Sequence, residues 1–210
     1  MTLFSLTDNN RRIEVRAPEN DSLEKILTDL RESPRCGKCK GGMPIVFGMG
    51  PPHAELMSIG EGAGIDDMRT AEPFQGQAGI LLRRMLASID VKLEECYVCN
   101  VIKCIPLGER VFSPEEVQDC TPILLRQILA VRPRVIVAFG ALAAQTLLQS
   151  VRPISSLRGS VYSVSINDHD VSLVPTFNPA YLLRAPLKKR EAWEDLKIVR
   201  GLLRSAILAE

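Results

Sequence analysis

Four short apolar runs alternate with segments of helical periodicity along this chain of 210 residues. The runs cover 55–60, 97–102, 134–140 and 171–177, and the helical segments cover 76–88, 114–130, 141–149 and 187–208. Runs that are apolar on both faces are typical of parallel strands buried between helices. The alternation therefore predicts an α/β fold whose parallel sheet is covered on both sides.

The carboxyl ends of the predicted strands carry the residues best suited to binding a ligand. In parallel sheets a ligand binds beyond these ends. The first strand ends in a glycine-rich loop, 60–64, and the second reaches Asn100. Gly140 follows the third strand, and residues 177–179 follow the fourth. We expect the functional site at this edge of the sheet.

Residues 1–33 are expected to form an N-terminal extension, and residues 34–210 the main domain. Within the extension, a helix is predicted over 21–31 from leucines and an isoleucine at helical spacing after an Asp-Ser start signal. The segment 34–52 is rich in Gly, Pro and Lys, which indicates irregular backbone that faces solvent.

The charge balance restricts how the chain can contact nucleic acid. It has 26 Lys and Arg against 25 Asp and Glu, a net charge of +1. A protein that coats itself with nucleic acid is usually more basic, so any DNA contact must come from local patches. No apolar run approaches the ~20 residues of a membrane-spanning helix, and the N-terminus does not resemble a secretory signal. We expect a cytoplasmic monomer with no membrane partner.

The spacing of four cysteines is compatible with metal or cluster binding. In a reducing cytosol, paired cysteines are more often ligands than disulfides. Cys36 and Cys39 lie in a Gly/Lys loop, Cys104 follows a predicted strand and Cys120 lies in a predicted helix. Their thiolates could hold a [4Fe–4S] cluster or a zinc ion, and scattered free thiols are the alternative.

Cys96 and Cys99 are a second pair with the same spacing, but they lie on a predicted strand. Residues three apart on a strand point to opposite faces of the sheet, so this pair is poorly placed to chelate a metal. We expect both to be buried small hydrophobic residues.

Five ordered blocks of the sequence resemble the motifs of the iron–sulfur (family 4) uracil-DNA glycosylases. The blocks are 60–64 with 73–79, 97–104, 132–140, 157–159 and 178–184. The resemblance covers roughly residues 36–203, and the order of the blocks together with the cysteine spacing makes coincidence a poor explanation.

This resemblance implies a three-layer α/β/α sandwich around a four-stranded parallel sheet. It also implies a [4Fe–4S] cluster held by Cys36, Cys39, Cys104 and Cys120. The cluster would be structural, holding loops near DNA without taking part in the chemistry. DNA is the implied partner.

Phe74 and Asn100 are expected to bind a base that has left the DNA stack, as enzymes acting on bases require. Phe74 matches the aromatic residue that stacks on the base in this family, and a core phenylalanine is the alternative. Asn100 matches the residue that reads the base edge, and an amide satisfied by a neighbouring loop is the alternative. A flipped amide reads cytosine as well as uracil, so Asn100 does not identify the base.

The loop 60–64 is expected to stabilise the departing base, because glycines let backbone N–H groups approach the charge that develops on O2. Uracil glycosylases outside this family often place an Asp in this loop to position water; here that position is Gly62. Ala63 stands where the family usually has a Pro. Gly62 and Ala63 are both expected to line the base pocket. Glu61 is the nearest carboxylate in the loop and a candidate catalytic residue, although it could equally cap local backbone.

Two other departures from the family motifs affect the expected chemistry. Asn178 stands where a His usually donates to O2, so leaving-group stabilisation should be weaker. Asp67-Met68 replaces a Glu-Asp pair whose first carboxylate lies beside C5 of the pyrimidine. We expect Asp67 and Asn178 to be catalytic residues, and expect the shorter Asp67 with flexible Met68 to widen the pocket near C5.

Tyr181, Leu182, Leu183 and Arg184 are expected to form a protruding loop that enters the duplex and fills the gap left by the flipped base. An exposed leucine pair followed by arginine suits a wedge beside a phosphate. The alternative is the first turn of the last helix, packed on the sheet. Arg158 is a further candidate for phosphate contact.

These features predict a monofunctional DNA glycosylase, with uracil as the default base and DNA repair as the expected role. No lysine is placed to form a Schiff base, so strand cutting is not expected. One alternative is excision of 5-substituted cytosines, hydroxymethylated or glucosylated, from phage DNA in antiviral defence. Alternatives of other classes are a non-catalytic iron–sulfur DNA-binding protein and, more remotely, a redox carrier.

Overall fold

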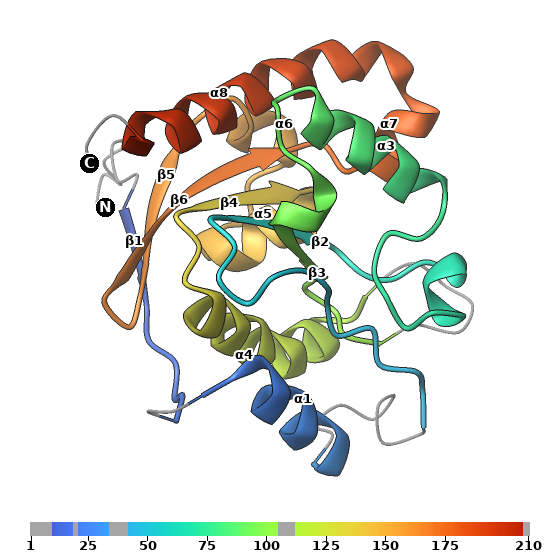
Figure 1. Ribbon diagram of the computed structural model, residues 1–210, viewed down its shortest axis with the longest axis vertical. Coiled ribbons are helices and arrows are strands. Elements are labelled where there is room, and N and C mark those ends of the chain that lie inside the picture. The colour runs from blue at the N-terminus through green and yellow to red at the C-terminus, as the bar shows by residue number, and fades with distance from the viewer. Residues whose placement is uncertain (1–9, 19–20, 34–41, 105–111, 208–210) are drawn as a thin grey trace, which may run out of the picture.

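The computed structural model describes residues 10–18, 21–33, 42–104 and 112–207. They form a central sheet with helices on both faces (Figure 1). The sheet has six strands in the order β1-β5-β6-β4-β2-β3. Their bounds are β1 Asn10–Ile13, β2 Leu56–Gly60, β3 Cys96–Asn100, β4 Val135–Phe139, β5 Tyr162–Ile166 and β6 His169–Thr176.

The four strands expected from the sequence are β2, β3, β4 and β6, and they pair in parallel as predicted. The prediction of a four-stranded sheet is nevertheless wrong, because β5 and β1 extend it. Strand β5 pairs antiparallel with β6 through a tight turn at Asn167 and Asp168, whose φ angles are 43° and 64°. Asn and Asp tolerate this left-handed conformation, so the Asn-Asp pair between two apolar runs indicates a hairpin, which was not among the predicted elements.

The helices divide between the two faces of the sheet. On one face lie α3 Gln77–Ala87, α7 Pro179–Arg184 and α8 Lys189–Ile207; on the other lie α4 Pro114–Val131 and α5 Ala141–Leu148. The short helix α6 Ile154–Leu157 and the 3-10 turns η1 Ile65–Met68, η2 Leu93–Glu95 and η3 Pro186–Lys188 complete the connections. No helix in the described ranges is long and apolar enough to cross a membrane.

Strand residues alternate between two hydrophobic clusters. In β2, Leu56 packs with α3 and α8, whereas Met57 and Ile59 pack with α4 and α5. The same alternation places Cys96 in the first cluster and Cys99 in the second, so these cysteines lie on opposite faces, as predicted. Burial raises the pKa of the Cys96 thiol to about 12, which keeps it neutral and unsuited to binding a metal.

The N-terminal residues contribute to this fold at two places. Strand β1 pairs with β5 at one edge of the sheet. Helix α1 (Leu23–Glu32), predicted from its periodicity, begins after the N-cap Ser22 and packs on the outside of α4 (Figure 1). Arg126 of α4 forms ion pairs of 2.6 Å with Asp21 and Asp29 beside an apolar contact formed by Ile26 and Leu30.

Candidate functional site

Phe74 lies directly against the carboxyl end of β2. A Cβ atom on Gly60 would be 2.6 Å from Cζ of the Phe74 ring, so no side chain fits there without movement. Phe74 has φ 59°, in the left-handed region, and a Cβ atom on Gly79 would be 1.5 Å from its carbonyl oxygen. Glycines at positions 60 and 79 therefore allow the ring to sit at the site-bearing edge. The ring is 8% exposed and also packs with the α3 core.

Asn100, the last residue of β3, is buried next to this ring. Its Oδ1 would be 2.3 Å from the same Cβ atom on Gly60. The side chain is 1% exposed, and neither Nδ2 nor Oδ1 has a hydrogen-bond partner among the described residues. Leaving a buried polar group unpaired costs about 1–3 kcal/mol. A buried amide without a partner among the described residues is a candidate contact for a ligand with complementary donors and acceptors.

Asp67 fixes the loop that carries Phe74. Its carboxylate accepts hydrogen bonds from the N–H of Gly64 at 2.8 Å and from the N–H of Gln75 at 2.7 Å. The side chain is only 5% exposed. Both oxygens thus bridge the start and the end of the segment between β2 and α3. The structure assigns Asp67 a positioning contact, and the expected position beside C5 of a bound base stays a prediction.

Glu61, which follows β2, and Asn178, which follows β6, are brought together at the carboxyl edge of the sheet. Glu61 accepts from the N–H of Leu142, at the start of α5, at 3.0 Å. Its other oxygen accepts from Nδ2 of Asn178 at 3.3 Å, and that same nitrogen donates to the Phe139 carbonyl. The Asn178 side-chain oxygen accepts from Ala180 as the N-cap of α7. The two side chains join the sheet edge to two helix N-termini, where a carboxylate is favourable.

The expected wedge, residues 181–184, is part of helix α7 and not a protruding loop. Helical geometry turns Leu182 inward, where it is 0% exposed and packs in the core with α3 and α8. Tyr181 and Leu183 are 38% and 44% exposed, and Arg184 is also exposed. The two leucines were expected to be exposed as a pair, but neighbouring residues of a helix point in different directions.

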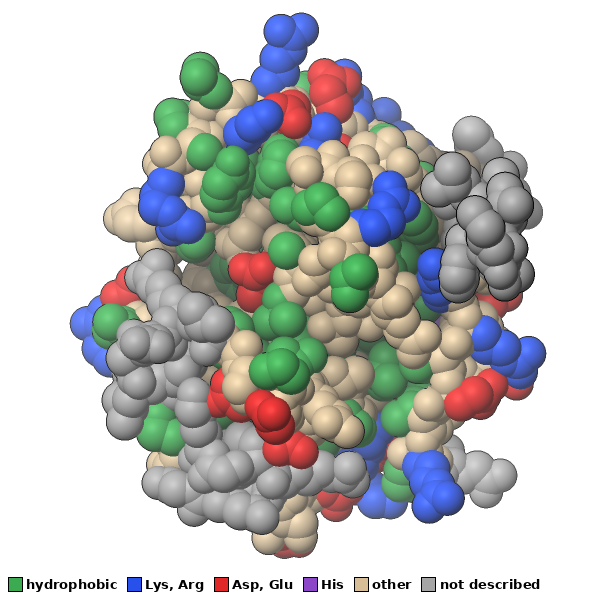
Figure 2. Space-filling view, turned by 180° about the vertical axis from the view of Figure 1, so that it is seen from behind, with side chains coloured by type: hydrophobic (Ala, Val, Ile, Leu, Met, Phe, Trp, Pro, Cys, Tyr) green, Lys and Arg blue, Asp and Glu red, His purple; other side chains and the backbone are tan. Residues whose placement is uncertain are grey.

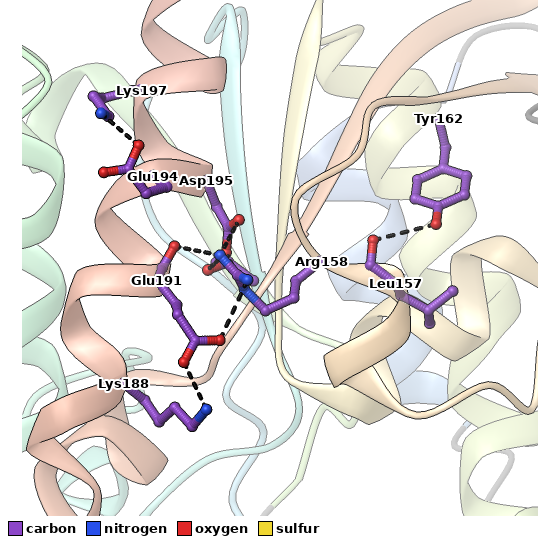
Figure 3. A network of polar contacts seen from close by, with 9 residues as sticks. Leu157, Arg158, Tyr162, Lys188, Glu191, Glu194, Asp195 and Lys197 are labelled. Atoms are coloured by element: carbon purple, nitrogen blue, oxygen red, sulfur yellow. Dashed lines mark hydrogen bonds and ion pairs between the residues drawn. The ribbon is translucent and has the colours of Figure 1, made fainter.

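Arg158 lies in a polar network that ties α8 to the sheet (Figure 3). Its guanidinium bonds both carboxylate oxygens of Asp195, at 3.0 and 2.7 Å, and also bonds Glu191. Asp195 accepts a further bond from Thr176 at the end of β6. The guanidinium also lies 5.4 Å from the centre of the Phe177 ring. These contacts hold the Arg158 guanidinium inside the fold, and its expected contact with phosphate stays a prediction.

Basic side chains on the face shown in Figure 2 are interspersed with acidic and apolar ones over the described residues. This distribution fits the net charge of +1. A hollow of about 500 Å³, lined by Glu55, Leu56 and Ile89 among others, lies at the amino end of β2, away from the site.

A comparison with known families assigns the chain. Residues 47–197 match the family described as the uracil DNA glycosylase superfamily. The chain belongs to the uracil-DNA glycosylase superfamily. The type-4 uracil-DNA glycosylase of Archaeoglobus fulgidus is 37% identical over 186 residues, which cover 87% of this chain and 94% of that protein. The resemblance expected from the motifs is thereby confirmed.

Two further relatives support the assignment. The type-4 uracil-DNA glycosylase of Thermotoga maritima is 37% identical over 163 residues, 76% of this chain and 83% of that protein. The type-4 enzyme of Sulfurisphaera tokodaii is 31% identical over 187 residues, 87% of this chain and 85% of that protein.

Two of the four cysteines expected to bind a cluster are buried on the same face of the sheet. Cys104 and Cys120 are 1% and 3% exposed, and both belong to the core on the α4 face. Cys36 and Cys39 lie outside the described residues. Within the described ranges, no group of three or more metal-ligating side chains is present.

Lys103 is an unforeseen feature beside these cysteines. It is 0% exposed, and its Nζ donates to the Asn100 carbonyl at 2.5 Å. Cys99 and Cys120 lie close enough to interact with its charge, and no carboxylate of the described residues pairs with it. Burial lowers the pKa of Lys103. A buried ammonium group requires a compensating charge, and an anionic thiolate cluster would supply one, so this donor set fits the cluster. The sequence signal that could have indicated this buried charge is a lysine directly before a cysteine within an apolar run.

Proposed function

We propose that the protein is a monofunctional DNA glycosylase that flips a pyrimidine, uracil by default, out of DNA and hydrolyses its N-glycosidic bond. The relatives are named uracil-DNA glycosylases. The observation that carries the proposal is the buried Asn100 amide beside the Phe74 ring, which has no hydrogen-bond partner among the described residues. A flipped pyrimidine supplies a flat face for the ring and a polar edge for the amide.

The loop after β2 would stabilise the leaving base. When the bond between C1′ and the base breaks, its electron pair moves to the base, chiefly to O2, and water adds to C1′. Within the described part of the chain, no hydrogen bond uses the N–H groups of Gly62 and Ala63, so both are available to O2. The Asn178 amide already donates to Glu61 and Phe139, so we expect it to contribute less.

Glu61 is the carboxylate of this loop that we assign to orienting the attacking water. The Leu142 N–H and the Asn178 amide hold it in one position. Lys103 is fully buried and bonded to the Asn100 carbonyl. We therefore expect it to form no Schiff base with the sugar, which agrees with base removal without strand cutting.

A labelled duplex containing one uracil tests the reaction. We expect the purified protein to convert it to a product that breaks only after treatment with alkali, because a monofunctional enzyme leaves an intact abasic strand. Breakage without alkali would contradict the monofunctional assignment. Intact DNA after alkali, with binding retained, would favour the non-catalytic iron–sulfur DNA-binding protein instead.

The exposed side chains of α7 are proposed to support the flipped state. Replacing Leu183 with alanine should slow uracil release from duplex DNA about tenfold and leave release from single strands unchanged, because a wedge matters only where a stacked partner must be replaced. Leu182→Ala is the matched control: it should lower the free energy of unfolding by about 2–5 kcal/mol without changing the duplex-to-single-strand ratio. Equal losses on both DNAs in Leu183→Ala would contradict the wedge role.

A 5-substituted cytosine of phage DNA is a second candidate substrate. It is favoured by Asp67, whose two oxygens are both engaged by the backbone of Gly64 and Gln75 and whose side chain is short. Room beside C5 would then admit a hydroxymethyl or glucosyl group. Asp67→Glu should shift excision toward uracil and away from the bulky base when the two DNAs are compared directly. Rapid uracil release by the wild type, with no action on modified DNA, would eliminate this candidate.

We further propose that Cys36, Cys39, Cys104 and Cys120 hold a [4Fe–4S] cluster. The burial of Cys104 and Cys120 supports it, as does Lys103, which is buried near them and pairs with no carboxylate of the described residues. When bound, the cluster would join the segment before β2 to the β3–α4 connection and to α4. Its role would be structural, and every chemical step described above uses the chain's own residues.

A further inference from the structure

Phe112 is an aromatic residue that contacts the same loop as Phe74 from another side. It directly precedes Ser113, the N-cap of α4. A Cβ atom on Gly62 would be 2.2 Å from Cζ of the Phe112 ring and 2.9 Å from Cε1 and Cε2. The outer edge of the ring therefore stands where a side chain at position 62 would be. Any residue larger than glycine at that position must displace it.

The two rings reach the loop from opposite faces of the sheet. Phe74 belongs to the core with α3 and α8, whereas Phe112 packs at the margin of the core with α4 and α5. Phe74 contacts Gly60 and Phe112 contacts Gly62, two residues farther along the loop. Two residues of chain span at most about 7 Å, so both glycines lie within reach of one nucleotide, whose base is bonded directly to its sugar.

We propose that Phe112 is a substrate-contacting residue whose ring lines the pocket beside the deoxyribose of the flipped nucleotide. This inference rests on the proposed glycosylase function. The Phe112 side chain is half-buried, and it contacts the half-buried loop at Gly62, where the N–H groups of Gly62 and Ala63 form no hydrogen bond with the described residues. Its apolar ring would exclude water from that main chain and pack against the sugar. It would do so in the space that a polar side chain at position 62 would otherwise occupy.

Affinity for two DNA probes separates the sugar contact from the base contact. One is a duplex with a tetrahydrofuran abasic analogue, which has the sugar ring but no base. The other carries 2′-fluoro-arabino-uridine, whose glycosidic bond resists hydrolysis. Phe112→Ala should weaken binding to both probes, relative to undamaged duplex, by about tenfold. Phe74→Ala should weaken binding to the uridine probe and not to the abasic probe, because that ring faces the base.

Gly62→Ala provides a second route to the same answer. The added methyl group should displace the Phe112 ring and reduce the preference for the abasic probe, even if Phe112→Ala folds poorly. In the double variant Gly62→Ala/Phe112→Ala the added methyl group meets no ring. The double variant should therefore lose no more preference for the abasic probe than Phe112→Ala alone. A folded Phe112→Ala protein that keeps the wild-type preference for the abasic probe would overturn the inference while leaving the glycosylase function intact. If the wild type prefers neither probe and releases no base, both proposals are wrong.

Discussion

Replacing Asn100 with leucine is expected to make the protein more stable and, at the same time, inactive. The Asn100 amide is 1% exposed and unpaired among the described residues, and leucine has a similar shape without polar atoms. Removing the unsatisfied amide should raise the free energy of unfolding by about 1–3 kcal/mol. Losing two hydrogen bonds to the base should slow its release by about 100-fold or more.

Gln127→Leu is the matched control for this experiment. Gln127 is also a buried amide, but its Nε2 donates to the Phe47 carbonyl at 3.0 Å and to the Tyr97 hydroxyl at 3.1 Å. Its replacement should lower stability while base release continues. Denaturant unfolding and single-turnover base release measure the two effects. An Asn100→Leu protein that is destabilised yet active would show that the amide is structural and that the base pocket lies elsewhere.

Removing iron is expected to destabilise the protein strongly, and the loss should depend on Lys103. Without an anionic cluster, the buried Lys103 amine has no carboxylate partner among the described residues, only the Cys99 and Cys120 thiols, and burial lowers its pKa. Leaving one member of a buried charge pair uncompensated costs about 3–5 kcal/mol. Lys103→Met should therefore stabilise the iron-free protein and destabilise the iron-loaded one.

Chelator-treated and iron-loaded samples of both proteins give the four unfolding free energies that this prediction needs. The iron-loaded wild type should be brown, with a broad absorption shoulder near ~400 nm, and Cys120→Ser should lose that colour. Arg204→Met, which removes an exposed ion pair with Asp90, is the control and should change stability by less than about 1 kcal/mol in both states. A colourless zinc protein, or an equal effect of Lys103→Met with and without iron, would contradict the cluster assignment.

Strands β2, β3 and β4 could be predicted because every one of their residues is buried, and β6 because most of its residues are buried. Strands β1 and β5 could not be found this way, since β5 alternates between buried and more exposed residues and β1 is mostly polar. The turn at Asn167 and Asp168 pairs β5 with β6, and β1 pairs with β5 although the two strands are far apart in the sequence. Local patterns predict elements more reliably than their neighbours in a sheet.

The residues of the site could be named from the sequence, but their contacts could not. The motifs placed Asn100 and Asn178 at strand ends and Phe74 in a glycine-rich turn, where the structure also has them. That Asp67 bridges two backbone N–H groups depends on how its loop closes, which has no periodic signal. Phe112 and Lys103 were overlooked because packing against a glycine and burial of a charge are visible only in three dimensions.

The most direct test of the proposed function is mass spectrometry of the free bases that the iron-loaded wild-type protein releases from defined duplexes. Separate duplexes should contain uracil, hydroxymethylcytosine, glucosylated hydroxymethylcytosine or only the four normal bases. Release of a free pyrimidine from at least one of the first three, and its loss in Asn100→Leu, is the predicted result. No free base from any duplex, despite an intact cluster and a folded protein, would contradict the account.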